Sequence, residues 1–221
     1  MKYYPINLTL KDRKCLIAGG GQVALRKVRR LIACAADIRI ISPQIVPQLL
    51  EIARKNIIKM CYRDICSDDL NDLFMVFAAT NNETVNTSIA QWARAKNILC
   101  NIADRPEESD FILPSVIEQG DLCLTISTNG KSPALSKHLR KRFQDEFGEE
   151  YAAFLNMMGK LRTLLNKEIS CQKDRQKIYQ SLLDSPILDC LKKNDLNTAS
   201  NTCEKLTGHC LDEIICVQDC S

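Results

Sequence analysis

The stretch Lys14-Cys15-Leu16-Ile17-Ala18-Gly19-Gly20-Gly21-Gln22-Val23-Ala24 places three glycines directly after a short apolar run and before a helical pattern. Glycine permits a turn too tight for a side chain and lets a pyrophosphate approach the N–H groups of the next helix. The spacing Gly19-x-Gly21-x-x-Ala24 fits the dinucleotide-binding fingerprint, whose third position is Gly or Ala. An ordinary turn between a strand and a helix can have the same pattern without a ligand, so the neighbouring elements must decide between the two.

Strand and helix patterns alternate around this loop. Apolar and β-branched runs predict strands at 14–18, 37–42, 57–62, 73–79 and 97–102. Helical spacing predicts a helix that follows the glycine loop and carries residues 23–32, and further helices at about 46–55 and 83–96. The alternation predicts an α/β fold with a parallel, doubly wound sheet. The first helix has apolar residues on one face, and its outer face is expected to carry Arg26, Lys27, Arg29 and Arg30.

The residues after the second and fourth strands are polar, and ligands of open α/β sheets bind at such carboxyl ends. A typical dinucleotide site has an Asp or Glu after the second strand for the ribose hydroxyls, but here Ser42, Pro43 and Gln44 follow. Ribose recognition must then use Ser42, Gln44 or backbone groups, and the choice between NAD and NADP stays open. Residues 80–82 are candidate contacts and are equally natural as a helix N-cap. The candidate cofactor-binding residues are Gly19, Gly21, Gln22, Val23, Ser42, Pro43, Gln44, Thr80 and Asn81.

The pattern changes after residue 102. Residues 103–107 form a charged loop, 110–114 predict a short strand, and 116–118 with 122–127 predict a separate hairpin. Ser132 and Pro133 favour the start of a helix that runs to about residue 147. Helices are expected at 151–166 and 172–183, with shorter pieces from 195. Apolar side chains at helical spacing predict the core of this region: Phe154, Met157, Met158, Leu161 and Leu164.

The composition excludes several classes of protein. With 221 residues, 45% of them hydrophobic and 26% charged, the chain is typical of a soluble globular protein. It contains no run of eighteen apolar residues and does not begin with the long apolar core of a signal peptide, so we expect a cytoplasmic protein with no membrane span. A net charge of +3 is too small to indicate a nucleic-acid partner.

The chain has twelve cysteines, six of them at strand-like apolar positions in the first 125 residues and six from Cys171 onward. In a reducing compartment, cysteine behaves as a small hydrophobic residue. No C-x-x-C pair occurs, so the usual zinc spacings are absent. Structural cysteines are favoured, and a metal site or a disulfide among the later six stays open.

Four motifs occur in an order that resembles a known family. They are the glycine loop followed by Arg26 and Lys27, Asn101-x-x-Asp104, Phe111-x-x-Pro114, and residues 126–133 followed by Leu139 and Arg140. Together they resemble the precorrin-2 dehydrogenase / sirohydrochlorin ferrochelatase family, the N-terminal module of siroheme synthases. The resemblance covers residues 1–150 well, is fair to about 185 and is absent from the cysteine-rich tail.

The resemblance implies three parts and a homodimer. The parts are an NAD-binding Rossmann domain at 1–113, a small α+β dimerisation segment at 114–147 and a helical C-terminal domain at 148–221. An isolated hairpin is only marginally stable and needs a partner sheet, which agrees with dimerisation.

The resemblance also implies a chemistry. NAD⁺ would take a hydride from precorrin-2 to give sirohydrochlorin, and Asp104, which matches the catalytic aspartate of the family, would remove a proton as a general base. Because the tetrapyrrole is a polycarboxylate, Lys and Arg are natural partners, although a solvated basic helix face has the same composition. The candidate substrate-binding residues are Thr128, Lys131, Ser132, His138 and Arg140.

Three alternatives stay open. In bifunctional relatives the same aspartate assists the insertion of Fe²⁺ into sirohydrochlorin, which makes Asp104 a possible metal contact here. The chain could instead be a regulatory Rossmann module that senses NAD(H) without tetrapyrrole chemistry. It could also bind heme or a metal through its cysteine-rich tail.

Overall fold

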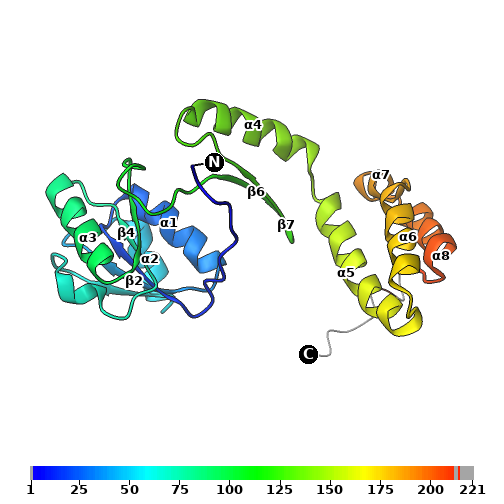
Figure 1. Ribbon diagram of the computed structural model, residues 1–221, viewed down its shortest axis with the longest axis horizontal. Helices are drawn as coiled ribbons and strands as arrows, with labels where there is room; N and C mark the ends of the chain where they lie inside the picture. The colour runs from blue at the N-terminus through cyan, green and yellow to red at the C-terminus, as the bar shows by residue number, and fades with distance from the viewer. Residues whose placement is uncertain (1, 212–213, 215–221) are drawn as a thin grey trace. The chain divides into compact units, whose positions relative to one another are not determined.

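The computed structural model describes residues 2–211 and 214, and it divides into two compact units, Met1–Leu113 and Pro114–Ser221. The first unit contains a five-stranded sheet with helices, and the second contains a two-stranded hairpin followed by helices (Figure 1). Each unit has its own hydrophobic core.

The sheet of the first unit has the strand order β3-β2-β1-β4-β5, and all of its neighbouring strands are parallel. The central strand β1 pairs with β2 on one side and with β4 on the other. The chain therefore changes direction across β1 between β3 and β4, and this switch point is where open α/β sheets bind ligands. The predicted parallel, doubly wound sheet is confirmed. Its strands are β1 (Lys14–Ala18), β2 (Asp37–Ile41), β3 (Ile58–Cys61), β4 (Met75–Ala78) and β5 (Leu99–Ile102).

Helices cover both faces of this sheet. On one face, α1 (Gln22–Ala33) and α2 (Pro47–Arg54) pack against Cys15 and Ile17 of β1. On the other face, α3 (Glu83–Ala95) and the short 3₁₀ helix η1 (Ser67–Leu70) pack against Leu16 and Ala18. Burial on both faces explains why the strands read as continuous apolar runs instead of alternating ones.

The second unit begins with an antiparallel hairpin, β6 (Ser115–Gln119) and β7 (Leu122–Ile126). The helices that follow are α4 (Pro133–Glu146), α5 (Glu150–Glu168), α6 (Gln172–Leu183), α7 (Ile187–Lys192) and α8 (Leu196–Thr207). Helices α5 to α8 share one core, in which Phe154, Met157 and Leu161 are buried as predicted, while Met158 and Leu164 lie at its edge. The sequence pattern did not predict the short helices α7 and η1.

The prediction of a strand at 110–114 is wrong. The Asp110 backbone N–H donates to the Cys100 carbonyl at 2.9 Å, and the Asn101 side chain donates to the Phe111 carbonyl at 2.9 Å. Phe111 packs edge-on against Phe77, with 5.7 Å between ring centroids. Single contacts to β5, not a strand ladder, hold this segment, and its apolar residues serve packing.

The cysteines follow the sequence prediction only in part. Cys15 and Cys100 are buried in the first unit, where burial raises the pKa of their thiols to about 11 and about 12, so they stay neutral. Cys34, Cys66 and Cys123 are exposed, which the expectation of apolar positions did not foresee. Within the described part of the chain all cysteines are free thiols, and no helix is long and apolar enough to cross a membrane.

Candidate active site

The glycine loop after β1 is shaped by close approaches of the backbone. Gly19 has φ +114°, a conformation that disfavours side chains, and a Cβ there would overlap the Ala79 carbonyl after β4. A Cβ on Gly20 would overlap the Gln44 carbonyl after β2. The first two glycines are thus required by the packing of the loop against neighbouring strand ends.

Gly21 differs from the two glycines before it. A Cβ at this position would meet no atom within 4 Å, so the loop faces open space there. Gly21 is also the N-cap of α1 and makes no side-chain cap hydrogen bond, and the first turn of α1 contains no acidic residue. Gln22 and Val23 begin this turn. Unpaired N–H groups and a positive helix end beside open space fit the diphosphate of a dinucleotide.

Some of the polar residues predicted beside this loop form hydrogen bonds within the protein, and others are exposed to solvent. Ser42 is buried, and its hydroxyl donates to the Gln44 carbonyl at 2.7 Å, while Pro43 and Gln44 are exposed. The Thr80 hydroxyl donates to the buried Asn86 side chain at 2.7 Å. The hydroxyls of Ser42 and Thr80 therefore stabilise turns.

The loop between β4 and α3 carries the predicted N-cap as well. The side chain of Asn82 accepts a hydrogen bond from the Val85 N–H at 3.2 Å, so Asn82 caps α3. Asn81 is exposed, which leaves its side chain accessible from solvent. A cofactor contact from this loop would therefore come from Asn81 or from the backbone.

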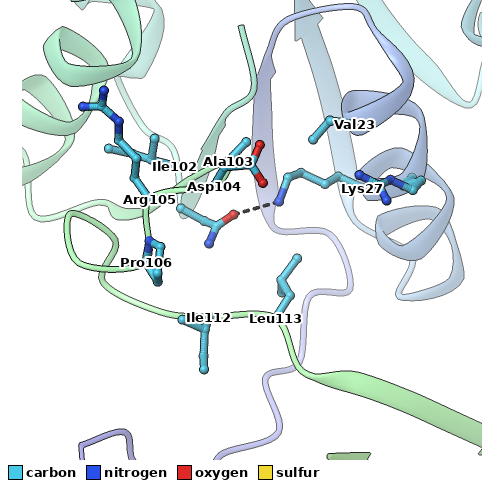
Figure 2. Close-up of a pocket in the computed structure, with 11 residues that line it drawn as sticks. Val23, Lys27, Ile102, Ala103, Asp104, Arg105, Pro106, Ile112 and Leu113 are labelled. Atoms are coloured by element: carbon cyan, nitrogen blue, oxygen red, sulfur yellow. Dashed lines mark hydrogen bonds between the residues drawn. The ribbon is translucent and has the colours of Figure 1, made fainter. Parts of the chain in front are cut away.

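Asp104 lies in an open pocket of about 210 Å³ between α1 and the loop after β5. Its side chain is exposed, and its backbone has φ +64°, a left-handed conformation that Asp and Asn tolerate better than other non-glycine residues. The next residue, Arg105, pairs with Glu83 and with Glu108, the latter at 2.9 Å. The loop is thus anchored at Arg105, and Asp104 faces the pocket (Figure 2).

Lys27 of α1 lies on the opposite wall of the same pocket (Figure 2). Its ammonium donates to the Asn101 side-chain oxygen at 2.7 Å and lies 4.8 Å from the centroid of the Phe77 ring. Burial, with help from neighbouring Arg26, lowers the pKa of Lys27 to about 8, and the charge of Asp104 acts in the opposite direction.

The sequence prediction placed Lys27 on the outer face of its helix, and it is instead half-buried at the border of the pocket. The position of Lys27 in the sequence relative to Val23 and Leu31 could have predicted its burial. Lys27 follows the pocket residue Val23 by four positions and precedes the buried Leu31 by four, so all three share one side of α1.

The predicted substrate-binding residues belong to the second unit. The Thr128 hydroxyl accepts from the Ser132 N–H at 3.1 Å, and Ser132 caps α4 through a hydrogen bond from the Leu135 N–H at 3.2 Å. Lys131 and His138 are exposed, and Arg140 donates to Gln144 on its own helix at 3.3 Å. Thr128 and Ser132 therefore have local structural roles, and the basic side chains are accessible on α4 and the loop before it.

The late cysteines that the structure describes differ in burial, since Cys171 is exposed and Cys210 is partly exposed. Cys190 and Cys203 are buried among the helices α5 to α8. Across residues 2–211 and 214, no three His, Cys, Asp or Glu side chains are grouped so that they could hold a metal ion. Cys216 and Cys220 lie outside the described residues.

The fold and the glycine loop define a dinucleotide-binding protein of the Rossmann class. Residues 6–115 match the family model described as putative NAD(P)-binding, and residues 119–146 match the model described as sirohaem biosynthesis protein central. Together the two models cover more than half of the chain. The chain therefore belongs to the siroheme biosynthesis family that its sequence resembles.

Similar proteins agree with this assignment. A siroheme synthase of Thioalkalivibrio sulfidiphilus is 30% identical over 212 residues, which cover 96% of this chain and 43% of the relative. A siroheme synthase of Pseudoalteromonas translucida is 28% identical over 206 residues, covering 93% of this chain and 44% of the relative. The chain thus spans less than half of the length of these curated relatives.

One solved structure shares the fold. It is described as SirC, precorrin-2 dehydrogenase, and superposes with a TM-score of 0.78 at 22% identity, covering 94% of this chain and all of the other. The likeness includes both the sheet unit and the helical unit, because it extends over nearly the entire chain.

Proposed function

We propose that the protein oxidises precorrin-2 to sirohydrochlorin with NAD⁺ in siroheme biosynthesis. The observation that carries the proposal is the juxtaposition of an uncapped helix N-terminus behind a glycine loop with a pocket that presents Asp104. The similarity to siroheme synthases and the match to the sirohaem central model point to the same substrate class.

In this proposal the loop from Gly19 to Gly21 and the first turn of α1 hold the diphosphate. Bound NAD⁺ supplies the acceptor for the hydride that leaves the tetrapyrrole. Asn81 and backbone groups after β2 and β4 would contact the remaining parts of the dinucleotide, because the hydroxyls of Ser42 and Thr80 already have partners. Without a carboxylate after β2, the preference for NAD over NADP rests on the family.

Asp104 would act as the general base. Loss of a hydride from precorrin-2 leaves a cation, and loss of one proton completes the oxidation. The exposed carboxylate of Asp104 is free to accept that proton from a substrate in the pocket, since its loop is fixed through the ion pairs of Arg105. Lys131, His138 and Arg140 would contact carboxylates of the polyanionic substrate.

We extend the proposal to a homodimer in the cytoplasm. The hairpin β6-β7 is a sheet of two strands, and Leu122, Leu124 and Ile126 alternate on one side of β7 and are half-buried. Two strands are marginally stable alone, so pairing with a second copy would stabilise them. Light scattering coupled to gel filtration tests this: twice the mass of the chain supports the dimer, and a single mass contradicts it.

A second activity, insertion of Fe²⁺ as a substrate, would use the same site. Asp104 is exposed in the pocket and could accept pyrrole protons as the metal enters. The test is the absorbance change of sirohydrochlorin with Fe²⁺ under anaerobic conditions. Loss of the change in an Asp104→Asn variant would support insertion at this site, and an unchanged rate would place metal entry elsewhere.

The decisive experiment is the appearance of NADH when freshly prepared precorrin-2 is mixed with NAD⁺ and the protein. Turnover supports the dehydrogenase. Tight binding of NAD⁺ without any oxidation would instead favour a module that senses NAD(H).

A further inference from the structure

The ammonium of Lys27 is a cation held at the edge of the first unit's core. One of its three N–H donors is directed at Asn101 Oδ1, 2.7 Å away, and the Phe77 ring lies on another side. The Asn101 amide is itself fixed, because its nitrogen donates to the Phe111 carbonyl at 2.9 Å. The direction of the Lys27 side chain is therefore set by two neutral partners.

Among residues 2–113, which the structure describes, no carboxylate forms a salt bridge with the Lys27 ammonium, so its positive charge has no direct counter-ion there. Arg26 and Arg30 on the same helix disfavour the charge, and Asp104 across the pocket favours it, but the salt bridges of the first unit do not include Lys27. A half-buried ammonium costs free energy unless an anion compensates it. An anion that enters the pocket would supply this compensation.

We propose that Lys27 binds a carboxylate of the acidic substrate and so positions the reacting carbon beside Asp104. This inference rests on the proposed function and names a substrate contact in the first unit. Figure 2 shows Lys27 and Asp104 reaching into the same pocket from α1 and from the loop after β5. A carboxylate held by Lys27 would keep the substrate on that side, where Asp104 can reach a neighbouring proton.

The diphosphate of the dinucleotide is the other anion that could meet Lys27. Gly21 caps α1 and Lys27 lies six residues further along, which corresponds to about 9 Å along the helix axis. The backbone of Lys27 is therefore more than one helical turn from a diphosphate seated on the first turn, and its ammonium is directed at Asn101 of β5. Separate titrations with NAD⁺ and with the tetrapyrrole distinguish the two sources.

A dependence on pH follows from the surroundings of Lys27. The charged groups near it are Arg26 and Arg30 on α1 and Asp104 after β5, and Phe77 and Asn101 are neutral. With the pKa of Lys27 lowered to about 8, the ammonium is present at pH 7 and is lost as the pH rises through 8. The value of kcat/KM, which reports groups of the free enzyme, should fall above about pH 8.

The test compares three variants of the full chain. Lys27→Met removes the charge and keeps the length, Lys27→Arg keeps the charge at all pH values used, and Arg29→Met is the matched control. Arg29 is exposed on the same helix and does not line the pocket. The readouts are kcat/KM for precorrin-2 from pH 6 to 10, the dissociation constant of sirohydrochlorin, and that of NAD⁺.

For Lys27→Met we expect kcat/KM and sirohydrochlorin affinity to fall by about 10- to 100-fold at pH 7, the worth of a hydrogen bond to a charged group. NAD⁺ affinity should not change, and Arg29→Met should match the wild type. Lys27→Arg should keep much of the activity and lose the fall above about pH 8. Rescue by arginine separates binding of an anion from a purely structural role.

Several results would overturn the inference. They are an equal loss of NAD⁺ affinity in Lys27→Met, equal behaviour of Lys27→Met and Arg29→Met, or a pH profile of Lys27→Arg that matches the wild type. If the wild type does not oxidise precorrin-2, the proposed function fails, and the sirohydrochlorin titration still decides whether Lys27 binds a carboxylate. Unchanged sirohydrochlorin affinity in Lys27→Met would then overturn the inference as well.

Discussion

Gly19 and Gly21 lie two positions apart in the loop after β1, and a side chain would meet different surroundings at each. Gly19→Ala would place a methyl group against the Ala79 carbonyl in a backbone conformation with φ +114°. We expect it to lower the free energy of unfolding by about 1–3 kcal/mol. Gly21→Asp enters open space and should leave thermal unfolding nearly unchanged.

The Gly19 and Gly21 variants distinguish an effect on folding from an effect on cofactor binding. An aspartate at the N-cap of α1 would satisfy the free N–H groups and put a negative charge where the diphosphate is expected, so NAD⁺ affinity should fall by about tenfold or more. Thermal unfolding and NAD⁺ titration of both variants provide the measurement. A Gly21→Asp variant that binds NAD⁺ like the wild type would contradict the placement of the diphosphate.

Asp69 links the stability of the first unit to pH. It is buried, accepts two hydrogen bonds of 2.7 Å from the Arg63 guanidinium and accepts a third from the Cys66 N–H at 2.9 Å. These contacts, above all those of Arg63, hold the pKa of Asp69 well below its usual range. A depressed pKa contributes stability above the unfolded value near 3.9, and this stability is lost as the pH falls below it.

We therefore expect Asp69→Asn to destabilise the protein by about 1–3 kcal/mol at pH 7, because the amide cannot replace a carboxylate that pairs with Arg63. The difference from the wild type should shrink below about pH 4. Asp68→Asn, an exposed neighbour in η1, is the control and should have little effect. Denaturant unfolding at pH 7 and at pH 3 checks this. An equal difference in the free energy of unfolding between variant and wild type at the two pH values would contradict stabilisation by the ion pair.

Single residues also show which features of the site can be predicted from the sequence and which cannot. The glycine loop could be interpreted from the sequence because Gly, turn and helix start are all local features. Lys27 was assigned to the solvated face because lysine is usually exposed, whereas its partners Asn101 and Phe77 come from two other strands. Contacts that join distant parts of the chain have no local signal in the sequence.

At the scale of elements, Ser132 decides how α4 begins. Its side chain accepts a hydrogen bond from the Leu135 N–H, and Pro133 follows at the first helical position. Ser132→Ala should destabilise the second unit by about 1 kcal/mol, whereas Ser132→Asn keeps a capping oxygen and should not.

The two Ser132 variants also test whether this residue binds substrate. If it serves only as a cap, Ser132→Asn will keep both the thermal stability and the sirohydrochlorin affinity of the wild type, because asparagine caps without adding a charge. Weaker sirohydrochlorin binding by a stable Ser132→Asn variant would support a contact between Ser132 and the substrate.

The strands and long helices followed from the sequence to within a few residues, since periodicity and capping residues are local. The segment at 110–114 did not, because its apolar residues resemble a strand but pack as an extended piece beside β5. The helix α7 was missed because it is six residues long and its helical character depends on packing against α5 and α8.

At the scale of the whole molecule, the first unit contains its own sheet, two cores and the pocket with Asp104. We expect a fragment of residues 1–113 to fold by itself and to bind NAD⁺ with the affinity of the full chain. Circular dichroism and NAD⁺ titration measure this. A fragment that is unfolded, or folded but unable to bind NAD⁺, would mean that the second unit completes the cofactor site.

In the proposed function, the first unit's pocket oxidises precorrin-2 with Asp104 as the base. The most direct test is NADH absorbance during anaerobic incubation with precorrin-2 and NAD⁺, for the wild type and for Asp104→Asn. Asparagine is chosen because it tolerates the left-handed backbone of residue 104 and removes only the carboxylate. We predict turnover by the wild type and at least about a 100-fold loss in the variant, with NAD⁺ affinity unchanged. A wild type that binds NAD⁺ but forms no NADH, or a variant as active as the wild type, would contradict the claim.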